Sequence, residues 1–133
     1  MSRLVIFDFD GTLTDAEQEG LPFRDGYLED LALLADIERE QAFALAERFE
    51  AEVAGMADAF GWNFNGRIVA PAGVDPYLRM MPVARKIFDH AGVFLDLEQR
   101  DRLLDRILYK YNYGKSATVF RDGARERRQD DAK

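Results

Sequence analysis

The chain opens with an unbroken apolar run that leads into two carboxylates. Residues 4–9 read Leu-Val-Ile-Phe-Asp-Phe, and Asp10 and Gly11 follow them. A continuous apolar run of this length is typical of a strand covered on both faces, as in a parallel sheet. Side chains two residues apart on a strand point the same way, so we expect Asp8 and Asp10 to face one site at the end of this strand.

After this stretch the pattern predicts helices. A polar loop is expected at 14–20, and a short helix at 26–35. A long helix from about 37 to 60 follows, with Asp36 as its N-cap. Apolar side chains recur along it at spacings of three and four, which predicts one buried stripe: Leu45, Phe49, Val53, Met56 and Phe60.

The second half of the chain predicts two further helices. Residues 62–76 are punctuated by Gly, Asn and Pro and indicate a loop, with a short extended piece at 67–70. One helix is expected at about 82–91, with Gly92 just past its end. Another begins after Asp96 as N-cap, with Gln99 in the position of a capping box, and continues to Tyr111. Residues 116–120 form a candidate second short strand, and the polar residues 121–133 are expected to be a frayed tail.

Composition and charge narrow the class of protein. The 133 residues carry a net charge of -7, which argues against binding to nucleic acid or to an anionic membrane surface. There is no cysteine, so thiolate chemistry and cysteine-bound zinc are excluded. No apolar run is long enough to span a bilayer, and no signal sequence precedes residue 4. These features predict a cytoplasmic protein without a membrane or nucleic-acid partner.

The segment 8–15, Asp-Phe-Asp-Gly-Thr-Leu-Thr-Asp, resembles the first motif of the haloacid dehalogenase (HAD) superfamily, Asp-x-Asp-x-Thr after an apolar strand. The resemblance implies an α/β ancestry in which a helical cap is inserted after this motif. It divides the chain into the first strand and motif loop at 1–14, a helical cap at 15–115, and a re-entry segment with a polar tail at 116–133. Within the last part, "TVFRDGARE" resembles the point where family members return to the core.

The same resemblance implies a chemistry. Asp8 would be the nucleophile that takes up a phosphoryl group, and Asp10 the general acid and base. Thr12 would hydrogen-bond near the site and hold the acid/base carboxyl. Mg²⁺ would be bound by the Asp8 carboxylate and the Asp10 backbone carbonyl, and the substrate would be a small phosphorylated metabolite.

The resemblance is incomplete. Family members carry a later Ser or Thr and a Lys that bind the phosphoryl group, followed by acids that complete the metal site. Lys110 and Lys115 precede the re-entry segment, which is the wrong order, and the chain is similar only to the first third to half of a HAD protein. Two functions therefore stay open: a magnesium-dependent phosphohydrolase that needs further core elements, and a non-catalytic helical module that binds a partner or itself.

Several side chains are expected to have structural roles. Asp15 is expected to be a loop acid or a helix cap, and the cations Arg24, Arg67 and Lys86 are expected to lie on the solvated surface. Five aromatic residues are expected to form the core of the cap: Trp62, Phe64, Tyr109, Tyr111 and Tyr113. The strand at 4–9 needs a partner, because unpaired backbone groups beside an apolar surface are costly. The candidates are residues 116–120, a second copy of the chain in a homo-oligomer, and a complementing core fragment.

Overall fold

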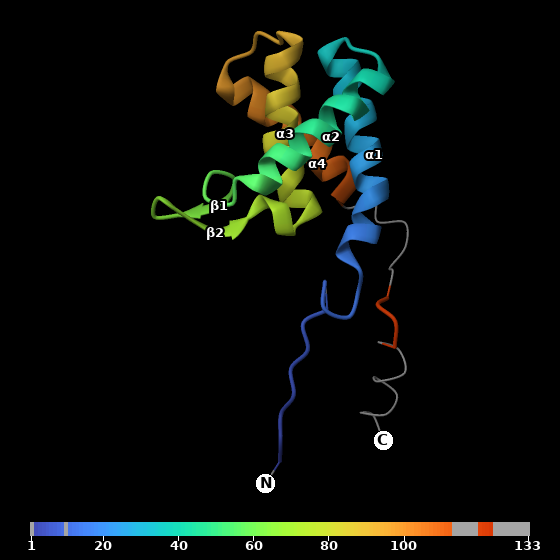
Figure 1. The fold of residues 1–133 in the computed structure, drawn as a ribbon, viewed down its shortest axis with the longest axis vertical. Helices are drawn as coiled ribbons and strands as arrows, with labels where there is room; N and C mark the ends of the chain where they lie inside the picture. The colour runs from blue at the N-terminus through green and yellow to red at the C-terminus, as the bar shows by residue number, and fades with distance from the viewer. Residues whose placement is uncertain (1, 10, 113–119, 124–133) are drawn as a thin grey trace.

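The computed structural model describes residues 2–9, 11–112 and 120–123. It is a helical bundle with one small hairpin (Figure 1). In chain order the elements are α1 (Ala16–Ala35), α2 (Arg39–Gly55), β1 (Gly61–Phe64), β2 (Arg67–Pro71), the 3-10 helix η1 (Ala72–Val74), α3 (Pro76–Ala91) and α4 (Leu97–Asn112). The prediction of a mostly helical chain is confirmed. In the described ranges, no helix combines the length and the apolar character that a membrane span requires.

Helix α1 begins inside the segment that was predicted to be a polar loop. Asp15 is its N-cap, one of the two roles expected for this residue, and its Oδ1 accepts a hydrogen bond from the Gln18 backbone N–H at 3.1 Å. Gly20 lies within the helix and is buried. A Cβ at this position would stand 2.8 Å from the ring of Pro76, so the glycine is needed for close packing against α3. It does not mark a turn.

Asp36 ends α1 instead of capping α2. Its backbone is in the left-handed region (φ 52°, ψ 47°), and its N–H bonds to the carbonyls of Ala32 and Leu33. Asp tolerates this conformation better than most residues, which explains why it can stand at a helix C-terminus. Helix α2 starts later, after Glu38, and ends at Gly55, so the predicted range 37–60 is wrong at both ends. Within the predicted stripe, Phe49 and Val53 are buried as expected.

The segment predicted to be mostly loop contains an antiparallel hairpin. Asn65 (φ 50°) and Gly66 (φ 79°) form its two-residue turn, in which both residues need a positive φ. The Asn63 Oδ1 accepts a hydrogen bond from the Gly66 N–H at 3.0 Å. Because the hairpin projects from the side of the bundle (Figure 1), Trp62 and Phe64 are 67% and 64% exposed. Their predicted place in the core is wrong.

Helices α3 and α4 are capped by side chains. The Asp75 carboxylate accepts hydrogen bonds from the first backbone N–H groups of α3, which starts earlier than predicted and contains Pro82. Gly92 ends α3 in the left-handed conformation (φ 70°), as expected. The Asp96 Oδ1 accepts from the Gln99 backbone at 2.8 Å, which confirms the predicted start of α4.

The core lies between the four helices. Its largest fully buried side chains come from α1, α2, α3 and α4: Tyr27, Leu28, Leu31, Val53, Met80, Val83, Ile87, Phe88 and Leu104. The Tyr27 hydroxyl donates to the Leu104 carbonyl at 3.3 Å, and burial raises the pKa of this phenol. The polar end of the side chain is therefore satisfied inside the core.

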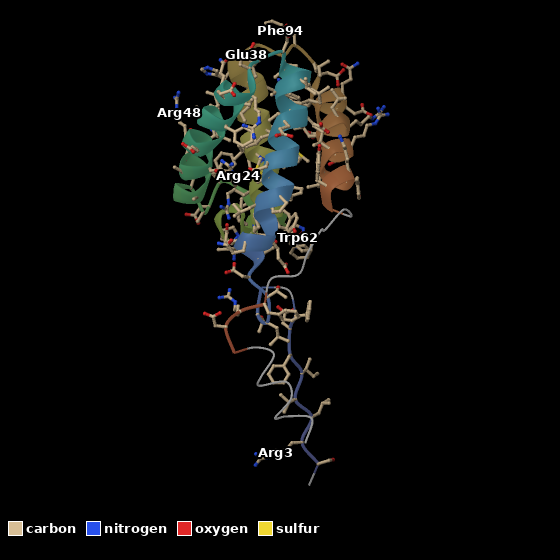
Figure 2. All side chains as sticks on the ribbon, turned by 90° about the vertical axis from the view of Figure 1, so that its right-hand side faces the viewer. Arg3, Arg24, Glu38, Arg48, Trp62 and Phe94 are labelled. Carbon is tan, nitrogen blue, oxygen red and sulfur yellow. The ribbon has the colours of Figure 1, made fainter. Side chains whose placement is uncertain are left out.

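The predicted N-terminal strand does not form in the part of the chain that the structure describes. Residues 2–9 extend away from the bundle, with Arg3 far from every helix (Figures 1 and 2). Leu4 is 85% and Ile6 83% exposed, where burial on both faces was expected. The physical reason is that the bundle supplies no sheet to which this segment can add. Of the second predicted strand, only Phe120 lies within the described residues.

We expect Gly26→Ala to destabilise the protein although it lies inside a helix. Gly to Ala in a helix normally stabilises by about 0.4–1 kcal/mol. Here the new Cβ would stand 2.3 Å from the Tyr111 ring on α4, and overpacking of this kind typically costs about 1–3 kcal/mol. Gly55→Ala is the matched control, because nothing lies within 4 Å of its Cβ position. Urea unfolding should show opposite signs for the two variants, and equal signs would contradict the packing described here.

The exposed N-terminal segment generates a second prediction. We expect the chain to self-associate at micromolar concentration through residues 4–7, because their apolar side chains and backbone groups are open to a partner. Ile6→Lys should abolish the association while the helical circular dichroism signal is retained. Light scattering on both proteins makes the comparison. A wild-type chain that stays monomeric at high concentration would show that the segment is not a contact.

Candidate functional site

The motif residues lie where residues 2–9 meet the start of α1. The Thr12 Oγ1 donates a hydrogen bond to the Asp8 Oδ2 at 3.2 Å, and both residues are exposed. Gly11 adopts φ 78°, so the backbone turns back between them. Asp10, the second predicted acid, lies outside the described residues. The structure thus brings together two of the three predicted site residues, Asp8 and Thr12. The Thr12 hydroxyl donates its hydrogen bond to the Asp8 carboxylate.

Thr14 holds this turn in shape. Its side chain is fully buried, and its Oγ1 accepts a hydrogen bond from the Gly11 N–H at 3.0 Å. The Leu13 and Thr14 N–H groups both bond to the Phe9 carbonyl, at 3.1 and 3.3 Å. Sequence reasoning assigned Thr14 no role. The sequence does contain a signal for this role: a hydroxyl side chain stands three residues after Gly11, where it can form a hydrogen bond back to the turn.

Phe120 and Arg121, from the other end of the chain, dock onto the same turn. Phe120 and Thr14 form an antiparallel bridge, and the Arg121 N–H donates to the Leu13 carbonyl at 2.9 Å. The Arg121 guanidinium bonds to the Gly11 carbonyl through Nε at 3.2 Å and through Nη2 at 3.0 Å, and its Nε also lies 3.2 Å from the Thr14 carbonyl. Two segments more than a hundred residues apart in sequence are therefore held together beside Asp8.

An aromatic contact adds to this junction. The rings of Phe9 and Phe120 meet edge to face, with centroids 6.0 Å apart and planes at 87°. This arrangement is the favoured one for aromatic pairs. The turn and the re-entry segment thus share backbone hydrogen bonds, an arginine fork and a ring contact. We refer to this set, residues 9 and 11–14 with Phe120 and Arg121, as the junction.

The junction offers few ligands for a metal ion. Among the described residues, no group of three or more His, Asp or Glu side chains is placed to hold one. Asp8 supplies a single carboxylate, and one of its oxygens already accepts the Thr12 hydroxyl. Mg²⁺ requires near-octahedral oxygen coordination. The described donors therefore do not form a magnesium site by themselves.

Two of the cations predicted to be solvated surface have specific partners. Arg24 forks onto Glu50 with distances of 2.7 and 3.0 Å, and this hydrogen-bonded pairing raises the pKa of the guanidinium. The side chains of both residues are less than one-fifth exposed. Lys86 donates to Glu52 at 2.7 Å. The prediction is therefore wrong for Arg24, whose pair lies in a partly buried space between α1 and α2.

No family model matches the chain, and a search of curated proteins and of solved structures finds no match either. The HAD resemblance therefore rests on the motif residues of the sequence alone.

Arg121 should hold the junction closed. We expect Arg121→Gln to accelerate hydrogen exchange at the Leu13 and Thr14 amides, because the carbonyls of Gly11 and Thr14 lose their charged donor. Arg3→Gln removes the same charge at an exposed position and should leave these rates unchanged. Exchange measured by nuclear magnetic resonance on both variants separates the cases. Equal rates in the two variants would show that the fork does not stabilise the turn.

Proposed function

We propose that the chain is the first motif and helical cap of a HAD-like phosphohydrolase. The observation that supports this most is the junction. The chain leaves the motif at Thr14, folds four helices and a hairpin, and comes back to the same place at Phe120. A helical unit inserted between two adjacent linkers beside the motif is the organisation that the resemblance implies.

In the proposed reaction Asp8 is the nucleophile. Its carboxylate is exposed, and the hydrogen bond from Thr12 occupies only Oδ2, which leaves Oδ1 for attack on phosphorus. The new bond joins an Asp8 oxygen to phosphorus while the ester P–O bond breaks, and Asp10 gives its proton to the leaving alkoxide. Asp10 then takes a proton from water, the water oxygen attacks phosphorus, and inorganic phosphate leaves with Asp8 regenerated.

The substrate in this proposal is a small phosphate ester, and Mg²⁺ is its cofactor by resemblance. Asp8 and Asp10 would contribute ligands, and the ion would offset the repulsion between an anionic nucleophile and a phosphate. The remaining ligands of the ion would have to come from residues other than Asp8 and Asp10.

The 133 residues do not contain all the catalytic residues that the resemblance to the HAD superfamily implies. Nothing in the sequence matches the Ser or Thr, the Lys and the late acids that bind the phosphoryl group and the metal in the family. Stabilisation of charge in the transition state is usually the largest single contribution to catalysis. We therefore propose that activity requires a complementing core that adds strands beside residues 4–9.

A non-catalytic role is the second candidate. The exposed apolar side chains of residues 4–7 and of the hairpin, with Leu4 and Trp62 the most prominent, favour a module that binds a protein surface. This function needs neither an intact phosphate site nor a metal. The two candidates differ in whether Asp8 matters, since a binding module should tolerate its replacement.

We expect the chain alone to hydrolyse p-nitrophenyl phosphate, with magnesium present, no faster than its Asp8→Asn variant. The reason is the missing charge-stabilising groups, each of which contributes about 10²–10³ in rate in enzymes where one was removed. Magnesium-dependent turnover by the chain that is lost in Asp8→Asn would show that these groups are present after all.

A second arm tests the function itself. When the chain is joined to the remaining core of a HAD phosphatase, turnover should appear and should fall by at least about a hundredfold in Asp8→Asn, since the nucleophile is lost. Asp58→Asn changes the same charge at an exposed position outside the junction and should have no effect. A folded fusion without Asp8-dependent turnover would favour the binding module.

A further inference from the structure

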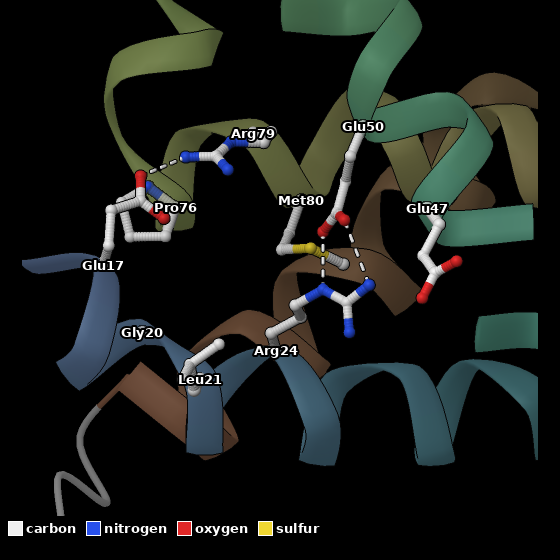
Figure 3. Close-up of a pocket in the computed structure, with 9 residues that line it drawn as sticks. All are labelled: Glu17, Gly20, Leu21, Arg24, Glu47, Glu50, Pro76, Arg79 and Met80. Atoms are coloured by element: carbon white, nitrogen blue, oxygen red, sulfur yellow. Dashed lines mark hydrogen bonds and ion pairs between the residues drawn. The ribbon is translucent and has the colours of Figure 1, made fainter. Parts of the chain in front are cut away.

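The arginines of the cavity between α1, α2 and α3 are already paired with glutamates (Figure 3). Arg24 is bonded to Glu50, and Arg79 to Glu17. An anion would have to displace a glutamate from its arginine, which is unfavourable for a partly buried pair. A chemically more reactive group lies outside this cavity, at the tip of the β1–β2 hairpin.

The tip of the hairpin carries an asparagine that is followed by a glycine. Asn65 and Gly66 are both exposed and form the two-residue turn. Asn65 is the only asparagine of the sequence that precedes a glycine, since bulky aromatic residues follow Asn63 and Asn112. A side chain on the following residue crowds the backbone nitrogen next to an asparagine, and glycine has no side chain. The Gly66 nitrogen is therefore the least crowded of the three.

An asparagine in this setting can lose its amide group without an enzyme. The Gly66 backbone nitrogen gives up its proton to water and attacks the Asn65 Cγ. The new N–Cγ bond forms while the Cγ–Nδ2 bond breaks, and Nδ2 takes up a proton from water and leaves as ammonia. Water then adds to a carbonyl of the resulting cyclic imide and opens the ring. Position 65 is left as either an aspartate or an isoaspartate.

Two features of the structure act on this reaction in opposite directions. Nothing lies within 4 Å of the position that a Cβ on Gly66 would take, so the nitrogen is not shielded on that side. The Gly66 N–H, however, donates a hydrogen bond to the Asn63 Oδ1 at 3.0 Å. The attack requires this proton to leave, and the hydrogen bond favours the protonated nitrogen. The Asn63 side chain therefore opposes the reaction at Asn65.

We propose that Asn65 is a site of spontaneous deamidation, and that Asn63 slows the reaction by holding the Gly66 N–H. Water is the co-reactant, and the reaction uses no metal ion. The inference goes beyond the proposed phosphohydrolase function, because it does not involve Asp8. It can be tested whether or not the chain takes part in phosphoryl transfer.

The two products have different effects on the hairpin. Aspartate before glycine is compatible with a two-residue turn, so this product keeps the pairing of Phe64 with Arg67. Isoaspartate directs the main chain through its Cβ and Cγ atoms, which adds one carbon to the backbone of the turn. Because the turn sets the register of a hairpin, we expect the isoaspartate product to lose this pairing.

The test follows the 133-residue chain in mildly alkaline buffer by mass spectrometry of its tryptic peptides. Conversion of amide to acid is expected at Asn65, while Asn63 and Asn112 serve as internal controls that stay unchanged. Asn63→Leu removes the acceptor and roughly keeps the size of the side chain. It should accelerate the conversion by about two- to tenfold, the factor that corresponds to the loss of one hydrogen bond.

Asn63→Asp is the matched variant that keeps an acceptor. Its negative charge also disfavours loss of the proton from the nearby Gly66 nitrogen, so Asn65 should react no faster than in the wild-type chain. Hydrogen exchange at the Gly66 amide, measured by nuclear magnetic resonance, should be faster in Asn63→Leu and not faster in Asn63→Asp. Contacts between Trp62 and Ala70 in the same spectra show whether the hairpin is still formed.

Four results would overturn the proposal. Asn65 could prove as stable as Asn112 in the wild-type chain, or Asn63→Leu could leave the rate unchanged. Asn63→Asp could accelerate the reaction as much as Asn63→Leu, which would exclude a role for the acceptor. Acceleration that occurs only with loss of the cross-strand contacts would assign the protection to the hairpin as a whole.

Discussion

The packing of α1 against three other helices is the constraint on which the rest of this structure depends. Helix α1 contacts α2, α3 and α4, so its apolar positions cannot be confined to a narrow stripe. Large side chains such as Tyr27 and Leu28 fill the space between helices, and glycines stand where another helix comes closest. Gly20 faces Pro76 of α3, and Gly26 faces Tyr111 of α4. The close approaches of α3 and α4 to α1 therefore depend on these two glycines.

Ion pairs connect the helices around this core. Seven pairs join different helices among the described residues: Arg24–Glu50, Arg39–Glu29, Arg79–Glu17, Lys86–Glu52, Arg85–Asp101, Arg100–Asp89 and Lys110–Asp30. The solvent-exposed pairs among them contribute little stability each, typically below about 1 kcal/mol. Each pair uses one acidic and one basic side chain, so the pairs leave unchanged the excess of 25 acidic over 18 basic residues in the sequence.

The sequence predicted the caps at helix ends better than it predicted the lengths of the helices. Gly92 and the Asp96–Gln99 cap were found because helix ends are set by nearby side chains and the backbone. The start of α1 was missed because Gly20 and Pro22 normally break helices, and only the close approach of α3 explains why Gly20 is tolerated. The hairpin was missed although Asn65-Gly66 is a strong turn signal.

The candidate site was predicted in part for the same reason. The turn at Asp8 and Thr12 follows from neighbouring residues, and the spacing of the motif was sufficient to find it. The contribution of Arg121 was not predictable, because it depends on a contact across 110 positions of sequence. Arg24 was misjudged for a similar reason, since its partner Glu50 lies on another helix. Contacts of this range are determined by the packing of the bundle and leave no local pattern.

The bridge between Thr14 and Phe120 also places the two ends of the helical part side by side. A domain whose two ends are adjacent can be placed in a surface loop of another protein without pulling that loop apart. The entropic cost of closing the host loop depends only weakly on the length of the insert, so the four helices add little to it. The helical part that begins after Thr14 therefore has the arrangement of ends that an inserted domain requires.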